Sequence, residues 1–375
     1  MTKVAVIIVN WRVRELLREC LSSIARAGGL DGVEHEIVVV DNDSADGSVE
    51  MLREDFPNVR LIVNADNVGF GAANNQAADL TGAPYLILLN PDTCVRNCAL
   101  RHLVDRLEGE RDVAIIGCRL LNADGSLQRW TGGAFPTLAN VACHYLFLDR
   151  LLPLALRPRP LYLEGDVGDT IDVDWVSGAC MIVRREALNG ALFDRRFFMY
   201  AEDMELCQRV KRGGWRVKYD PEISITHYQG ASIRQQSASI MLSSLKGPRF
   251  FFLLNHGRYR TAVFDILTLC GFGCRFLVYR AVSLLGGGRV YRERARSSRE
   301  YLRLAWRVWR EPVQRTWTGD KNISKSDTFY IMDGWVSDAA IDAHTAHPNV
   351  PRVVEQLLPL LAEPLDLAIS AKVNA

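Results

Sequence analysis

Three groups of polar residues in this sequence could carry chemistry, and the first is Asn90-Pro91-Asp92. These residues directly follow the apolar run Tyr85–Leu89, which is long enough for one buried strand. Pro91 fixes its own φ and lacks an N–H, so it ends the strand and holds the turn. The Asp92 carboxylate could then ligate a hard divalent cation that holds a diphosphate. Taken alone, an ordinary turn in which the aspartate bonds its own backbone is the simpler interpretation.

The second group is a pair of adjacent acids, Glu202 and Asp203, at the start of a predicted helix. This helix is expected to begin near Ala201 and to stop at Gly213-Gly214. Helical spacing places Asp203 on the apolar, inward face and Glu202 on the wetter face. A carboxylate in a partly dry pocket is suited to act as a general base. The alternative is that either acid only complements the helix dipole.

The third group centres on His227, which ends the apolar segment 223–227. Alone, a histidine at a strand end is more often structural than a ligand. Paired with Asp92, however, it would complete a cation site that could hold a diphosphate. A mixed carboxylate and imidazole set favours Mn²⁺ over Mg²⁺ without deciding between them.

Two further polar segments are suited to a nucleotide. Residues 41–44 (Asp-Asn-Asp-Ser) follow the second apolar run, where Asp41 could accept the imide N–H of a uracil or thymine ring. A polar turn that caps the next helix explains these residues equally well. Residues 67–75 contain Gly69 and Gly71, which permit close approach of a ligand, and they open a helix whose N-terminus favours phosphate.

Strands that alternate with helices must position these segments. Such a pattern is typical of a parallel sheet with right-handed βαβ connections, and ligands bind beyond the carboxyl ends of its strands. The expected strands are residues 4–9, 36–40, 60–63, 85–89, 113–118, 173–183 and 223–227. The expected helices are residues 14–27, 49–54, 67–82, 100–107, 184–190 and 201–213. Residues 135–169 are expected to be irregular.

Composition narrows the class of protein. The chain has 375 residues and a formal net charge of +1, which argues against bulk nucleic-acid binding. Its nine cysteines include no Cys-x-x-Cys pair, a usage that fits reduced thiols in the cytosol. The apolar start, residues 4–9, is too short for a signal peptide and is expected to be a buried strand. No Gly-x-Gly-x-x-Gly follows it, so a dinucleotide-dependent oxidoreductase is disfavoured.

The character of the chain changes at residue 246. Residues 263–285 are apolar but contain Asp265, Arg275 and Arg280, charges that disfavour a transmembrane helix. Residues 289–310 form a basic helix that carries Trp306 and Trp309, which favours an anionic membrane surface. The alternative is that both helices pack on the preceding domain or on a second subunit of a homo-oligomer. Residues 311–375 carry no motif that we can interpret.

Seven loose motifs in this order resemble glycosyltransferase family 2 enzymes of GT-A fold, and among these the bacterial rhamnosyltransferases of cell-envelope glycans. The resemblance covers about residues 4–230. The motifs are Val9-Asn10-Trp11, residues 39–44, residues 67–74, Leu89-Asn90-Pro91-Asp92, Ser177-Gly178-Ala179, residues 197–203 and Ile225-Thr226-His227. One departure is Asn90, which stands where the family commonly has the first Asp of Asp-x-Asp.

The resemblance implies an α/β fold of GT-A type, a mixed sheet flanked by helices, and a role for each motif. Asp92 and His227 would hold a divalent metal, Mn²⁺ or Mg²⁺, and Asp203, with Glu202 beside it, would be the catalytic base. The residues implied to bind the nucleotide sugar are Val9, Asn10, Asp41, Asn42, Ser44, Asn67, Gly69, Phe70, Asn74, Asn90, Pro91, Asp92, Trp175 and Gly178.

The implied activity is inverting transfer of a sugar, best guessed as rhamnose from dTDP-rhamnose, to a lipid-linked or polysaccharide acceptor. Residues 1–245 would form the catalytic domain, 246–310 a membrane-associating helical region and 311–375 a tail. The protein would then lie in the cytoplasm, peripheral on the inner face of the cell membrane. Two alternatives stay open: another donor sugar (mannose, galactofuranose or N-acetylglucosamine), or a non-catalytic protein that binds nucleotide sugars.

Overall fold

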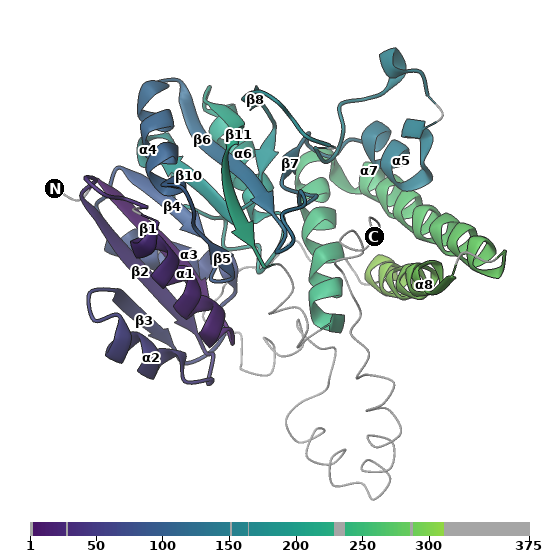
Figure 1. The fold of residues 1–375 in the computed structure, drawn as a ribbon. Helices are drawn as coiled ribbons and strands as arrows, with labels where there is room; N and C mark the ends of the chain where they lie inside the picture. Colours follow the sequence, from purple (N-terminus) through teal and green to yellow (C-terminus); the bar gives the residue numbers. More distant parts are fainter. Residues whose placement is uncertain are drawn as a thin grey trace, which may run out of the picture.

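A nine-stranded mixed β-sheet forms the body of the protein in the computed structural model, which describes residues 3–27, 29–150, 152–163, 165–228, 237–285 and 288–310 (Figure 1). Its strand order is β3-β2-β1-β4-β10-β6-β11-β5, and β8 also pairs with β11. The strands of this sheet are β1 (Val4–Asn10), β2 (His35–Asn42), β3 (Arg60–Asn64), β4 (Tyr85–Leu89), β5 (Thr93–Cys94), β6 (Val113–Leu121), β8 (Ile171–Asp172), β10 (Cys180–Arg184) and β11 (Arg216–His227).

The first four strands are parallel, as the alternation of apolar runs and helices predicts. Every residue of β1 is buried, which explains why this strand is apolar without alternation. Its neighbours β2 and β4 cover both of its edges. The helices of this part are α1 (Arg14–Arg26), α2 (Ser48–Asp55), α3 (Phe70–Leu80) and α4 (Ala99–Gly109).

Beyond β4 the sheet is mixed, in agreement with the mixed GT-A sheet that the resemblance implies, and the parallel arrangement predicted from alternating strands and helices holds for the first four strands. β10 runs antiparallel to both β4 and β6. The expected single strand over residues 173–183 is also divided. β9 (Trp175–Val176) leaves the main sheet to pair with β7 (Gly132–Gly133), and residues 177–179 separate it from β10. The N–H of Ser177 donates to the carbonyl of Thr131, which extends the pairing of β9 with β7 by one residue.

Two apolar cores fill the two faces of the sheet. One core joins the sheet to α1, α2 and α4 through side chains such as Leu17, Met51 and Leu103. The other joins it to α3 and to α6 (Glu202–Arg212) through Ala77 and Leu206. The helices thus cover both faces, and the ligand edge of the sheet stays accessible at the strand ends.

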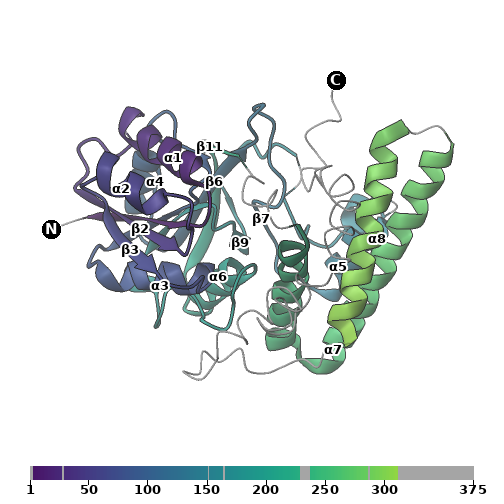
Figure 2. The ribbon, with the colours of Figure 1, turned by 90° about the horizontal axis from the view of Figure 1, so that it is seen from below.

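The C-terminal helices gather beside the sheet, on the side away from β3 (Figures 1 and 2). α7 spans Ser237–Leu284 and is broken at Gly257, where φ is 75° and ψ is 175°. α8 (Gly288–Arg310) packs along α7 through a cluster that includes Leu242, Phe272 and Val308. The first part of α7 also packs on the sheet body, because Phe251 belongs to the core on the α6 face.

The prediction that residues 135–169 are irregular is wrong in part. They contain α5 (Leu138–Leu146) and the short 3₁₀ helices Leu148–Arg150 and Leu154–Leu156. Thr137 and Asn140 form a capping box at the start of α5, a signal that the sequence contains. A third 3₁₀ helix, Arg185–Ala187, agrees with the helical turn predicted over 184–190.

Within the described residues, one helix, Leu242–Leu284, has a length and composition that would allow it to cross a membrane. One third of its most apolar stretch is buried inside the structure. Two of its charges are paired within the protein: Asp265 forms a buried ion pair with Arg249, and Arg275 donates to the carbonyl of His144 in α5. The ion pair links two turns of α7 to each other, and the hydrogen bond of Arg275 links α7 to α5.

Candidate active site

Backbone pairing holds Asp92 and His227 side by side beyond the ends of β4 and β11. Thr93 of β5 lies opposite His227 of β11 in an antiparallel pair. The N–H of Tyr228 also donates to the carbonyl of Asp92 over 2.7 Å. Nε2 of His227 lies 3.1 Å from Oδ1 of Asp92, and each side chain is only 9% exposed. The two predicted metal ligands are therefore in contact although 135 positions apart in the chain.

The pair has donor atoms that suit a divalent cation. A carboxylate oxygen and an imidazole nitrogen converge, and Nδ2 of Asn90 lies 3.4 Å from Nε2 of His227. In the described part of the chain, no group of three or more Asp, Glu, His and Cys side chains comes together. A cation bound by Asp92 and His227 would thus depend on substrate phosphates and water for its other ligands, a common arrangement for Mg²⁺.

The adjacent acids Glu202 and Asp203 occupy the first turn of α6, but their environments differ from the prediction. Glu202, expected on the wetter face, is 6% exposed, and its Oε2 has no hydrogen-bond partner among the described residues. Asp203 is the partly exposed member of the pair. Its Oδ2 accepts the N–H of Gly178 at 3.2 Å and its Oδ1 accepts the N–H of Met204 at 2.8 Å. The prediction from helical spacing is therefore wrong for Glu202, which is buried at the start of α6.

The two acids are pushed toward different protonation states. Burial, and after it the charge of Asp203, raises the pKa of Glu202 to about 8. Burial also raises the pKa of Asp203 to about 6, although the N–H groups of Gly178 and Met204 act to lower it. Near pH 7 Glu202 therefore keeps its proton while Asp203 is mostly a carboxylate. A partly exposed carboxylate with this pKa is suited to accept a proton.

A strained turn precedes the acids. Tyr200 has a φ of 70° and Ala201 a φ of 67°, backbone angles that residues other than glycine rarely adopt. Gly247 of α7 packs directly on this turn, since a Cβ at Gly247 would overlap the carbonyl oxygen of Tyr200. Burial, and after it the charges of Tyr301, Glu202 and Asp92, raises the pKa of Tyr200.

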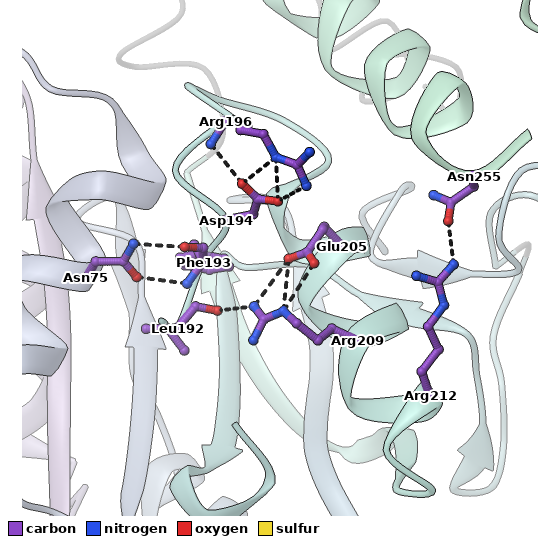
Figure 3. A network of polar contacts seen from close by, with 9 residues as sticks. All are labelled: Asn75, Leu192, Phe193, Asp194, Arg196, Glu205, Arg209, Arg212 and Asn255. Atoms are coloured by element: carbon purple, nitrogen blue, oxygen red, sulfur yellow. Dashed lines mark hydrogen bonds and ion pairs between the residues drawn. The ribbon is translucent and has the colours of Figure 1, made fainter. Parts of the chain in front are cut away.

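A network of polar contacts holds the segment that leads into α6 (Figure 3). Asn75 of α3 brackets the backbone of Phe193, donating to its carbonyl at 2.9 Å and accepting its N–H at 2.8 Å. Arg209 of α6 donates to the carbonyl of Leu192 and pairs with Glu205. Arg212 of α6 donates to Asn255 of α7 at 2.7 Å. These contacts tie α3 and α6 to the segment that precedes α6, and they tie α6 to α7.

The residues predicted to bind a pyrimidine meet at the ends of β1 and β2. Nδ2 of Asn10 donates to Asp41 at 2.8 Å and to Ser44 at 2.9 Å, and Asp41 also accepts the N–H of Ser44. All three side chains are buried. Oδ1 of Asn10 has no partner among the described residues, so one buried acceptor is left over at this strand end. Val9, also predicted here, packs in the core.

An open cavity of about 580 Å³ adjoins this strand end. Ser44 and Asp46 line one part of it, and Arg12 and Arg14 bring positive charge to another. Glu15 and Asp46 balance these charges, and Arg14 forms an ion pair with Glu15 at 2.8 Å.

The second predicted donor segment is organised by Asn42. Its Nδ2 donates to Oδ1 of Asn67 at 2.7 Å, and its Oδ1 accepts the N–H of Val68 at 3.0 Å. Gly69 has a φ of 86°, and a Cβ there would lie 2.7 Å from the carbonyl oxygen of Phe198. Asn74 donates to the carbonyl of Phe70 inside α3. These contacts fix the turn that places the N-terminus of α3 at the site.

Gly178 is the point at which the donor and base segments meet. The position of its missing Cβ would be 3.5 Å from the ring of Phe70 and 3.8 Å from Cβ of Asp203. Trp175, predicted at the same junction, is 3% exposed, and its indole N–H donates to the carbonyl of Ala134. It therefore supports the site from the core. Pro91 is likewise buried, in the turn between Asn90 and Asp92.

Three residues at the site were not anticipated from the sequence. Gln128 contacts His227, Tyr200 is the first residue of the strained turn before α6, and Asn75 fixes the segment before α6. Gln128 and Asn75 make contacts across 99 and 118 positions of the chain, and a single sequence carries no signal for them. Tyr200 directly precedes the predicted helix, but its positive φ has no signature in a residue other than glycine.

Comparison with known proteins identifies the family. Residues 5–191 match the family described as Glycosyl transferase family 2. The chain belongs to glycosyltransferase family 2. It is 28% identical over 235 residues to the N-acetylglucosaminyl-diphospho-decaprenol L-rhamnosyltransferase of Mycobacterium tuberculosis, a match that covers 59% of this chain and 75% of that protein. It is 26% identical over 236 residues to Rhamnosyltransferase WbbL of Escherichia coli, covering 60% of this chain and 83% of the relative.

A solved structure confirms the fold of this glycosyltransferase. The mannosyltransferase PcManGT from Pyrobaculum calidifontis, solved in complex with GDP-Man and Mn²⁺, superposes with a TM-score of 0.50 at 16% identity. The match covers 81% of this chain and 86% of that one. The predicted GT-A architecture, a mixed sheet flanked by helices with further helices at the C-terminal side, is thereby confirmed.

Proposed function

We propose that this glycosyltransferase is an inverting, metal-dependent rhamnosyltransferase that uses dTDP-rhamnose and a lipid-linked glycan acceptor. The observation that carries the proposal is that backbone contacts bring the metal segment next to the base: the N–H of Asn90 donates to the carbonyl of Ala179, and the adjacent Gly178 donates its N–H to Asp203. A site for a leaving diphosphate would thus face a site for a base. The names of the two relatives support rhamnose as the sugar.

In this proposal Asp203 accepts the proton of the acceptor hydroxyl as its oxygen attacks the anomeric carbon, and the bond to the diphosphate breaks on the opposite face of the sugar. Asp203 suits this role because it is partly exposed and has a raised pKa. Glu202 would stay protonated and leave a single negative charge beside the sugar, where an oxocarbenium-like state develops.

The donor would lie along the strand ends from β1 to β4. Asn10, Asp41 and Ser44 would surround the pyrimidine, while Asn67, Gly69 and the start of α3 would approach the diphosphate. Asp92 and His227 would hold a divalent cation, Mn²⁺ or Mg²⁺, which when bound would neutralise charge on the leaving diphosphate. PcManGT was solved with Mn²⁺ and GDP-Man, which supports metal dependence.

We also propose peripheral attachment to the inner face of the cell membrane, with residues 1–245 as the catalytic domain and 246–310 as the attaching region. One exposed face of α8 carries arginines at helical spacing: Arg292, Arg296, Arg299, Arg303 and Arg310. The acidic residues of this helix are Glu293 and Glu300. Trp306 and Trp309 are 49% and 39% exposed on the same helix. Arginine with tryptophan suits anionic headgroups, and the M. tuberculosis relative is named for a decaprenol-linked substrate.

The decisive experiment incubates the full chain with dTDP-rhamnose, UDP-N-acetylglucosamine, GDP-mannose or UDP-galactofuranose and a prenyl-diphosphate-linked N-acetylglucosamine acceptor. Products are followed by mass spectrometry with Mn²⁺, with Mg²⁺ and with EDTA. We expect transfer from dTDP-rhamnose that EDTA abolishes. Transfer from another donor would show that the donor sugar is not rhamnose, and the proposed mechanism would still apply. Binding of nucleotide sugars without transfer or hydrolysis would favour a non-catalytic protein, an alternative that Asn90 keeps open.

A further inference from the structure

Gln128 bonds His227 twice, at the backbone and at the ring nitrogen that faces away from Asp92. Nε2 of Gln128 donates to the carbonyl of His227 over 2.6 Å, and Oε1 of Gln128 lies 2.9 Å from Nδ1 of the imidazole. Gln128 is 8% exposed, and its own N–H donates to the carbonyl of Leu120 in β6. A buried side chain on a fixed backbone therefore holds the ring of His227.

These two contacts determine which nitrogen of His227 carries the hydrogen. A carbonyl oxygen can only accept, so the end of the Gln128 amide that faces the His227 carbonyl must be the NH₂ group. The oxygen of the amide then faces Nδ1, and because it can only accept, Nδ1 must carry a hydrogen. In a neutral imidazole the other nitrogen, Nε2, is left as a bare acceptor.

The bare Nε2 faces Oδ1 of Asp92 at 3.1 Å, so two acceptors converge, and the amide nitrogen of Asn90, a donor, lies 3.4 Å from Nε2. Lone pairs held this close repel each other unless a positive group lies between them. We propose that Gln128 is a positioning residue that fixes the Nδ1–H tautomer of His227, so that Nε2 and the Asp92 carboxylate converge on one divalent cation. This inference rests on the proposed metal role of the pair. Outer partners of metal-binding histidines commonly change metal affinity 10–100-fold.

The test measures Mn²⁺ affinity on the full chain without substrate, from the electron paramagnetic resonance signal of free Mn²⁺. Gln128→Met keeps the length of the side chain and removes both hydrogen bonds. We expect it to weaken Mn²⁺ binding by roughly 10–100-fold. Gln208→Met, on α6, is the matched control and should bind Mn²⁺ as the wild type does. Equal Mn²⁺ affinity in Gln128→Met and wild type would overturn the inference alone, whereas a wild type that binds no Mn²⁺ either by itself or with dTDP present would remove the proposed metal site as well.

A second measurement does not depend on any Gln128 variant being folded. Two-bond proton–nitrogen correlation spectra of the wild type, labelled with ¹⁵N-histidine, report which ring nitrogen carries the hydrogen. The His227 signal is assigned by its loss in His227→Ala. We expect Nδ1–H in the wild type without metal, and a larger Nε2–H share in Gln128→Met. A wild-type His227 with its only hydrogen on Nε2 would contradict the inference regardless of the metal titration.

Discussion

Asp203 is the residue whose loss should separate chemistry from binding. Asp203→Asn keeps the shape of the side chain, and its single amide oxygen can keep one of the two contacts with the N–H groups of Gly178 and Met204. An amide cannot take the proton of the acceptor, so we expect the rate of transfer to fall by roughly 10²–10⁴-fold. Donor affinity, measured by calorimetry, should change little because the donor segments are elsewhere. Transfer at the wild-type rate would show that another group is the base.

The split protonation of Glu202 and Asp203 predicts how activity depends on pH. The base acts as a carboxylate, and the pKa of Asp203 is raised to about 6. Activity should therefore be present above this value and should decline about tenfold per pH unit below it. The measurement is kcat/KM for transfer between pH 4.5 and 8, and the apparent pKa belongs to the pair of acids. A profile that stays flat to pH 4.5 would contradict the raised pKa.

At the scale of single residues, the sequence identified acids better than it identified their surroundings. Asp92 and His227 could be paired in advance because both end apolar runs, and parallel strand ends meet at one edge of a sheet. The burial of Glu202 could not be foreseen, since it depends on a turn with two positive φ values. Gln128 was missed for a different reason: its contacts with His227 exist only once β6 and β11 are adjacent.

Among the elements, α7 is expected to support the strained turn at Tyr200 and Ala201. Gly247→Ala adds a methyl group where only the Tyr200 carbonyl fits, so α7 must shift. We expect a loss of about 1–3 kcal/mol in the free energy of unfolding and a fall in kcat greater than any change in KM for the donor. Chemical denaturation and transfer kinetics measure the two effects.

Gly273→Ala is the matched control on the same helix. No atom lies within 4 Å of the added methyl group, and alanine is the better helix former, so stability should stay equal or rise. If both alanine variants had wild-type kcat, α7 would have no part in positioning the acids.

The elements themselves were predictable where periodicity was strong. The four parallel strands and helices α1 to α4 lie close to their predicted ranges. The division of residues 173–183 was not predictable, because β9 pairs with two glycines that are not recognisable as a strand. α5 could have been found from its capping box, and overlooking Thr137 and Asn140 made residues 135–169 look structureless.

For the whole molecule, membrane attachment should be tested by substitution and not by truncation. Removing the chain after residue 246 would also remove Phe251, which belongs to the core of the catalytic body. Replacing Arg296, Arg299 and Arg303 by glutamine alters only exposed positions. At about 1 kcal/mol for each arginine near an anionic surface, partitioning onto phosphatidylglycerol vesicles should fall by roughly a hundredfold.

The control replaces three exposed arginines of the body, Arg53, Arg111 and Arg195, which gives the same change of net charge. This variant should sediment with anionic vesicles as the wild type does, and neither protein should bind purely zwitterionic vesicles strongly. An equal loss in both variants would mean that net charge, and not the face of α8, governs attachment.

β11 is hydrogen bonded to β6 along one edge and to β8 and β5 along the other, and His227 is its last residue. Amide hydrogens in such a strand should exchange with deuterium slowly, while those of the turn at Tyr200 should exchange sooner. The protein would then be rigid at the site that binds the leaving nucleoside diphosphate and more mobile at the site that binds the acceptor hydroxyl. Such a difference in mobility would let the enzyme bind the same leaving group each time while it accepts acceptors of different length.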